Sequence, residues 1–128
     1  MAAAIPSSMY WQKKALKKTM TLQFDEDDDI LKGIESAMHE NCIFKADVAE
    51  ASGKIKSGLG NYVQGSQYMT KCFNDTEIKI ATGHFELGKK GLFGVLKIIP
   101  KDLNSHVSIG KAKAKKGMEI KLWYYEFE

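Results

Sequence analysis

Arginine is missing from this sequence, because all 19 of its basic residues are lysines. The planar guanidinium of arginine makes the paired hydrogen bonds that read guanine and enters narrow minor grooves, whereas lysine offers a flexible point charge. Against 16 acidic residues, the formal net charge is only +3. Sequence-specific reading of DNA is therefore disfavoured, while loose, salt-sensitive binding of phosphates through lysines stays open.

Long apolar runs and clustered cysteines are also missing. No apolar run approaches the roughly 20 residues that a membrane-spanning helix requires, so we expect no membrane partner. The N-terminal stretch lacks the basic-then-apolar order of a secretory signal, and residues 1–10 are interpreted as a flexible tail. The two cysteines, Cys42 and Cys72, fit no metal-binding or redox spacing. This favours a reduced pair, with a disulfide as the alternative, and a cytoplasmic protein.

The composition itself is that of an ordinary globular domain. Hydrophobic residues make up 44% and charged residues 27% of 128 residues, which is the length of one domain. A chain of this size buries roughly two-thirds of the surface that it exposes when unfolded, so it needs no disulfide or metal to fold. We therefore expect a single domain over residues 1–128.

The clearest helix begins after a run of five acidic residues, 25–29. Carboxylates suit a helix start because they accept hydrogen bonds from the free backbone N–H groups and favour the positive end of the helix dipole. Apolar residues then recur at helical spacing, which predicts a helix over about Ile30 to Glu40 with Asn41 as its stop. A calcium loop is a poor alternative, because Ile30 stands where such a loop requires glycine.

Strand and turn patterns dominate the rest of the chain. Alternating apolar residues up to Phe24 indicate one strand, and seven more are expected at about residues 42–49, 54–63, 68–73, 77–87, 92–99, 105–109 and 118–127. The nearly all-apolar segment 92–99 is expected to be central and covered on both faces. Asn74-Asp75 predicts a turn, and residues 110–117 predict a lysine-rich loop. The predicted fold class is α+β, a large mostly antiparallel sheet of about seven strands with one main N-terminal helix.

Four lysines between the last two predicted strands form a candidate site for nucleic acid. They are Lys111, Lys113, Lys115 and Lys116. Lysines 13, 14, 17 and 18 would join them in a weak, non-specific nucleic-acid-binding protein. The simpler interpretation is a solvated hairpin that protects the edge of the sheet.

The histidines are too few and too scattered to predict a zinc motif from spacing. His84 and His106 lie on separate predicted strands of one sheet, so they are candidate metal ligands if they converge. Isolated histidines bonded to neighbours are the alternative. No serine or cysteine stands in a nucleophile motif such as Gly-x-Ser-x-Gly, so the sequence specifies no reaction, and we expect no cofactor.

Apolar surface is left over when one helix covers so large a sheet, and self-association is an economical way to bury it. The last predicted strand carries Trp123 and Tyr125, and the segment before the Gly-Lys-Lys-Gly turn carries Phe85 and Glu86. These four are the candidate subunit-interface residues. Glu86 could instead belong to a pocket between subunits, together with His84 or His106, in a ligand-binding protein or an enzyme.

Several segments follow one another in an order typical of a known family. They are FDEDDDILKGIESAM at 24–38, GKIKSGLGNY at 53–62, GHFEL at 83–87 followed by Gly91, and HVSI at 106–109. Over about residues 16–128, this order resembles the PPC (plants and prokaryotes conserved) domain family, whose plant members carry AT-hooks. The resemblance implies a mixed α/β fold with a large antiparallel sheet, assembly as a homotrimer, and a role in oligomerisation and partner docking.

The DNA-binding and metal-binding properties of the family carry over poorly. DNA binding in plant members comes mainly from the separate AT-hook, and this chain has no Arg-Gly-Arg-Pro core. Some prokaryotic members resemble metal-binding proteins through a His-x-His pair and a later Gly-Gly-His. Here Asn104 stands at the first position of the pair, only His106 matches, and the later motif is missing.

The expected function is thus a non-catalytic, self-assembling trimer that docks protein partners, in a DNA-associated or regulatory role. The alternatives are a weak, non-specific nucleic-acid-binding protein, and a metal- or small-ligand-binding protein or enzyme with its site at a subunit interface.

Overall fold

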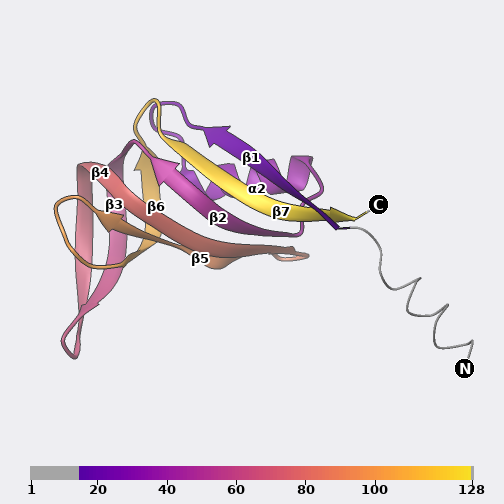
Figure 1. Cartoon of the computed structure of the whole chain (residues 1–128). Helices are drawn as coiled ribbons and strands as arrows, with labels where there is room; N and C mark the ends of the chain where they lie inside the picture. The colour runs from indigo at the N-terminus through magenta and orange to yellow at the C-terminus, as the bar shows by residue number, and fades with distance from the viewer. Residues whose placement is uncertain (1–14, 128) are drawn as a thin grey trace, which may run out of the picture.

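The computed structural model describes residues 15–127 of the chain, shown in Figure 1. The tail expected at residues 1–10, together with Lys13 and Lys14, lies outside the described residues. None of the described helical structure is long and apolar enough to cross a membrane.

The described chain forms one long helix and seven strands, and every strand pairing is antiparallel. The elements are β1 (Ala15–Gln23), α2 (Ile30–Glu40), β2 (Lys45–Ser52), β3 (Lys54–Gln64), β4 (Gln67–Gly88), β5 (Gly91–Pro100), β6 (Val107–Ala114) and β7 (Glu119–Phe127). The strands lie in the order β1-β7-β2-β4-β3-β6-β5, and β4 also pairs with β5. The predicted fold class, α+β with a large antiparallel sheet, is confirmed.

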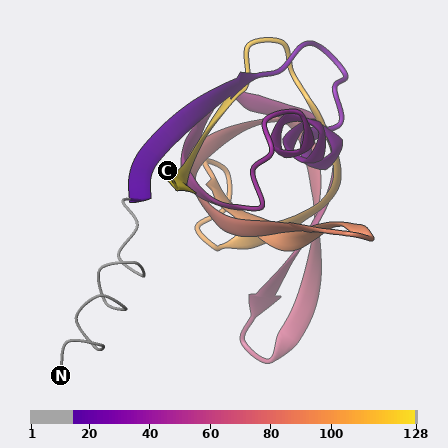
Figure 2. The same ribbon diagram turned by 90° about the vertical axis from the view of Figure 1, so that its right-hand side faces the viewer.

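Strand β4 is long enough to pair along both of its halves. Its first half pairs with β3 and its second half with β5, while β6 bridges β3 and β5. These four strands therefore close into a ring, which Figure 2 shows end-on. The turn predicted at Asn74-Asp75 is wrong, because Asp75 takes a φ of 49° inside one continuous strand. Asparagine and aspartate tolerate this left-handed conformation, so the same residues that favour a turn also allow a bend.

Helix α2 begins and ends where the sequence predicts. The Asp29 side chain accepts a hydrogen bond from the Lys32 backbone N–H at 3.0 Å, which caps the first turn. Ile30, Ile34 and Met38 are fully buried, and the helix packs against β1, β4 and β6. Figure 2 looks nearly along the helix, which lies against the concave side of the sheet. The core thus forms between α2 and the inner face of the curved sheet.

Two expectations about strands β5 and β6 are wrong. Strand β5 is not covered on both faces: Leu96 and Ile98 are buried, whereas Phe93 and Val95 are 56% and 44% exposed. The predicted lysine-rich loop at 110–117 is also wrong in its first half, because β6 runs on to Ala114. Alternation along β6 buries its alanines and leaves the lysines between them exposed, which explains the Lys-Ala run.

Candidate functional site

A broad outer face, defined here as the side of β7, β2, β4 and β5 that points away from the core, carries the main candidate site. Trp123, Asp47, His84 and Val95 lie opposite one another in register and form one row across the four strands. Exposed apolar side chains lie in and around this row, because strand alternation turns every second residue away from the core. They are Ile80, Phe93, Val95 and Tyr125, exposed by 44–56%. The row therefore mixes charge with unburied apolar surface.

A cluster of charged groups occupies the centre of the outer face. The Nδ1 atom of His84 lies 2.7 Å from Asp47 Oδ1, and its Nε2 atom lies 3.3 Å from Glu86 Oε2. The pKa of His84 is raised above its usual 6.5, and the hydrogen bond to Asp47 contributes most to this shift. The hydrogen bond to Glu86 makes the next largest contribution. Lys45 Nζ lies 3.9 Å from the second carboxylate oxygen of Glu86. The charges of this cluster thus have partners within the chain.

Next to this cluster lies an aromatic hollow, lined by Cys42, Phe44, Trp123 and Tyr125 among others, with a volume of about 790 Å³. It forms because the pairing of β2 with β7 ends at Trp123, whereas β7 continues beside β1 to Phe127. The Trp123 and Tyr125 rings meet edge to face, with centroids 5.5 Å apart. Lys17 Nζ lies 4.5 Å from the centroid of the Trp123 ring, a cation–π contact.

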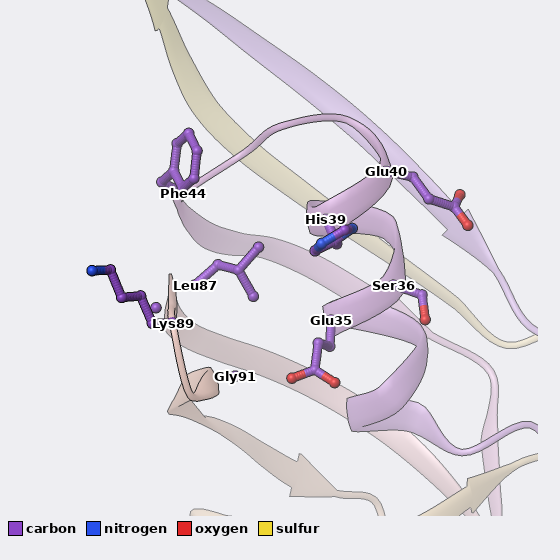
Figure 3. A pocket seen from close by; sticks show the side chains of 9 residues that line it. Glu35, Ser36, His39, Glu40, Phe44, Leu87, Lys89 and Gly91 are labelled. Carbon is purple, nitrogen blue, oxygen red and sulfur yellow. The ribbon is translucent and has the colours of Figure 1, made fainter.

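A second hollow, of about 670 Å³, lies between α2 and the turn that joins β4 to β5. Figure 3 shows Glu35 and His39 pointing from one side of the helix toward Leu87 and Gly91. Glu35 Oε2 accepts a hydrogen bond from the Leu92 backbone N–H at 2.8 Å. This carboxylate therefore ties α2 to the start of β5, which gives it a structural role.

Comparison with known proteins identifies the architecture. No family profile matches the chain, and no curated protein does. Solved structures do match, among them a metal-containing protein from Archaeoglobus fulgidus, at 20% identity and a TM-score of 0.70, covering 91% of this chain and 85% of that one. A PPC protein from Pyrococcus horikoshii matches at 14% identity and a TM-score of 0.62, covering 91% and 82%.

This chain has the PPC fold. A candidate DNA-binding protein from Bacteroides thetaiotaomicron shares it, at 16% identity and a TM-score of 0.60, with 86% of this chain and 82% of that one covered. The fold that the ordered motifs implied is thereby confirmed.

The PPC fold of this chain does not bring the two candidate metal ligands together. His84 is held by carboxylates on the middle of the outer face, whereas His106 lines a separate hollow of about 480 Å³ with Tyr68 and Lys97. Between residues 15 and 127 there is no group of three or more His, Cys, Asp or Glu side chains arranged to hold a metal ion. The structure therefore does not support a metal site shared by His84 and His106. His84 fits the alternative, a histidine that is hydrogen-bonded to neighbouring side chains.

Of the four candidate interface residues, the PPC fold leaves three accessible. Glu86 and Tyr125 are exposed and Trp123 is partly exposed on the outer face. Phe85 is fully buried, so its assignment to a subunit interface is wrong. Phe85 follows His84 along β4, and alternation turns it into the core. The aromatic hollow was missed, because it depends on where two strands part and not on a motif.

Two of the four candidate lysines, Lys115 and Lys116, contact acidic residues that are distant in sequence. The acidic run 25–29 lies along the end of β6, where Ala114 N–H donates to the Asp28 carbonyl at 2.8 Å. The Lys116 backbone N–H donates to Glu26 at 2.8 Å, and Lys115 Nζ lies 3.3 Å from Asp75. Neighbouring Lys56 bonds to both Glu26 and Asp27. A carboxylate therefore offsets the charge of Lys115, and the acidic run lies beside the backbone of Lys116, at one end of this candidate nucleic-acid site.

Proposed function

We propose that this protein is a self-assembling interaction domain, without a catalytic activity of its own, whose copies associate through the outer face. The observation that carries the proposal is the set of exposed apolar side chains on one sheet face, Ile80, Phe93, Val95 and Tyr125. Several exposed apolar side chains on one face indicate an interaction site more strongly than singly scattered ones do. The assembly that we propose is a homotrimer, as the resemblance to PPC domains implies, with further protein partners docking on it.

The charges of the outer face are compatible with being covered. Burial of an unpaired charge costs several kcal/mol, whereas a charge that keeps its hydrogen-bonded partner costs much less. Asp47, His84 and Glu86 already hold one another, and Lys45 lies beside Glu86. A second copy can therefore cover this cluster without supplying a compensating charge.

Binding of DNA has weaker support in this chain. One protein of the same fold is named as a candidate DNA-binding protein, and another as a PPC protein. Here, however, arginine is missing and the densest group of lysines lies against the acidic run 25–29. None of the three similar structures reported above is named as an enzyme.

Measurement of the solution mass by light scattering, at micromolar protein and across a dilution series, tests the proposal. We expect the mass of three chains. Replacing Phe93 and Val95 with serine removes apolar area from the outer face, so the double variant should dissociate at concentrations where the wild type stays assembled.

The matched control is Leu59→Ser, which removes an apolar side chain that is 51% exposed on β3. Strand β3 lies across the ring of strands from β5, so its outer side faces another direction. This variant should keep the wild-type mass. A wild-type protein that is monomeric throughout the series would refute self-assembly.

A further inference from the structure

The hairpin between β3 and β4 projects from the body of the molecule as an arm, defined here as residues 61–70. The pairing of β3 with β6 ends at Asn61, and beyond it β4 is the one described strand that pairs with β3. Figure 1 shows this hairpin extending away from the rest of the sheet. An isolated two-stranded hairpin is only marginally stable in water. Tyr62, Val63 and Tyr68 line one hollow with His106 at the base of the arm, and burial against a further surface would stabilise the arm.

The composition of the arm indicates what kind of surface would bury it. Its ten residues, NYVQGSQYMT, contain no charged side chain, although 27% of the whole chain is charged. Val63 and Tyr68 face each other across the hairpin and are 56% and 88% exposed. Tyr62 and Met69 form the corresponding pair on the other side. Large uncharged side chains on both sides suit insertion between apolar surfaces rather than contact with water.

We propose that the arm of one copy inserts into the aromatic hollow of the next copy. This inference rests on the self-assembly proposed above and adds which two surfaces meet. A closed ring of three copies needs a head-to-tail contact, in which two different patches of the same chain bind each other. The aromatic hollow lies beside the start of β2 and the end of β7, and Figure 1 places these strand ends at the opposite end of the described structure from the arm. The arm therefore reaches a neighbour's hollow and not its own.

The chemistry of the aromatic hollow matches that of the arm. Phe44, Trp123 and Tyr125 offer aromatic surface to Tyr68, and aromatic pairs contribute beyond the area that they bury. The acids at its rim keep partners, since Asp47 bonds to His84 and Glu126 to Lys18, the latter at 2.7 Å. An uncharged arm therefore leaves no rim charge unpaired when it enters. The hollow beside α2 fits less well, because Phe44 is the one Phe, Tyr or Trp side chain that lines it.

Disulfide trapping tests this contact, because the exposed native Cys42 lines the aromatic hollow. In a Cys72→Ser background, cysteine is placed in turn at Val63, Ser66 and Tyr68, and the protein is oxidised mildly. A disulfide forms only where the two Cα atoms come within about 7 Å. We expect at least one arm position to give covalent dimers and trimers on a non-reducing gel. The same variants with Cys42→Ser, and a Lys32→Cys variant with the cysteine on α2, should give none.

A mixing experiment tests the head-to-tail geometry. Tyr68→Ser weakens the arm and Tyr125→Ser weakens the hollow, and both side chains are exposed, so both variants should fold. Each alone should dissociate at least tenfold more readily than the wild type. An equimolar mixture should form a heterodimer, because the Tyr68→Ser copy keeps an intact hollow and the Tyr125→Ser copy keeps an intact arm.

The outcomes separate this inference from the proposed function. A wild-type trimer with no trapped disulfide at any arm position, and with unchanged mass for Tyr68→Ser, would overturn the arm contact and leave self-assembly standing. A monomeric wild type would overturn both.

Discussion

At the residue scale, His84 takes its character from neighbours on two strands. Glu86 is visible in the sequence two positions away, on the same face of β4, and alternation alone predicts that contact. Asp47 is 37 residues away and reaches His84 through the register of β2 against β4. Register between distant strands is not written in a local pattern, so the sequence predicted a metal ligand where the structure has a histidine between carboxylates.

The raised pKa of His84 predicts how stability depends on pH. The folded state binds the proton more tightly than the unfolded state, whose histidine pKa is about 6.5. The stabilising contribution is therefore complete below about pH 6.5 and is lost as the pH rises through the higher folded-state pKa. We expect the free energy of unfolding, measured by urea titration between pH 5.5 and 9, to fall over that interval.

The control for this pH effect is His84→Gln, which removes the titrating ring. Its unfolding free energy should lack the component lost above neutral pH, and an NMR titration of the wild type should show the His84 resonance moving above pH 6.5. Asp47→Asn should bring that midpoint down. Equal pH dependence in wild type and His84→Gln would contradict the assignment.

At the element scale, local chemistry decided what could be predicted. Helix α2 was predicted to its ends, because its capping residues, Asp29 and Asn41, directly flank the eleven residues that carry its apolar stripe. Strand β5 was misjudged because Phe93 and Val95 are apolar yet exposed. A sequence pattern shows that a side chain is apolar, but it does not show whether the same chain or another copy covers it. The aromatic hollow was out of reach for a related reason, since it arises where the ends of two strands part.

Strand β5 also contains a glycine that the pairing with β4 requires. Gly94 has a φ of 138°, and a Cβ added there would collide with the His84 carbonyl oxygen and with Phe85. We expect Gly94→Ala to lower the free energy of unfolding by about 1–3 kcal/mol from backbone strain, with a further loss from the collision. Urea denaturation measures the change.

Gly117 provides a matched comparison for this prediction. Its φ of 92° is also strained for alanine, but an added Cβ there meets nothing within 4 Å. Gly117→Ala should therefore show the strain without the collision and cost less than Gly94→Ala. An equal decrease in the free energy of unfolding of the two variants would mean that the collision at Gly94 has no effect on stability.

At the scale of the whole molecule, folding brings the acidic run 25–29 beside the end of β6 and Lys116. We expect no measurable binding of duplex DNA at physiological salt, because this negative charge lies next to the lysines. Glu26→Gln combined with Asp27→Asn should free Lys56 from its two acidic partners and strengthen DNA binding at low salt, by counterion release. Fluorescence anisotropy across a salt series measures both effects.

The control changes the net charge equally but elsewhere. Glu40→Gln combined with Glu50→Gln also removes two negative charges, from α2 and β2. It should raise DNA affinity less than the pair beside the lysines. Strong binding by the wild type at physiological salt would instead favour a nucleic-acid function.

The pairing of β1 with β7 has a consequence for biosynthesis. Its register runs from Ala15 with Phe127 to Gln23 with Glu119, so the first described strand gains its partner only when the last one has been made. At translation rates of 5–20 residues per second, β1 stays unpaired on the ribosome for roughly 5–20 s. Its lysines, Lys17 and Lys18, disfavour premature pairing with other nascent chains during that interval. The positive charge of β1 thus disfavours aggregation of the nascent chain before β1 pairs with β7.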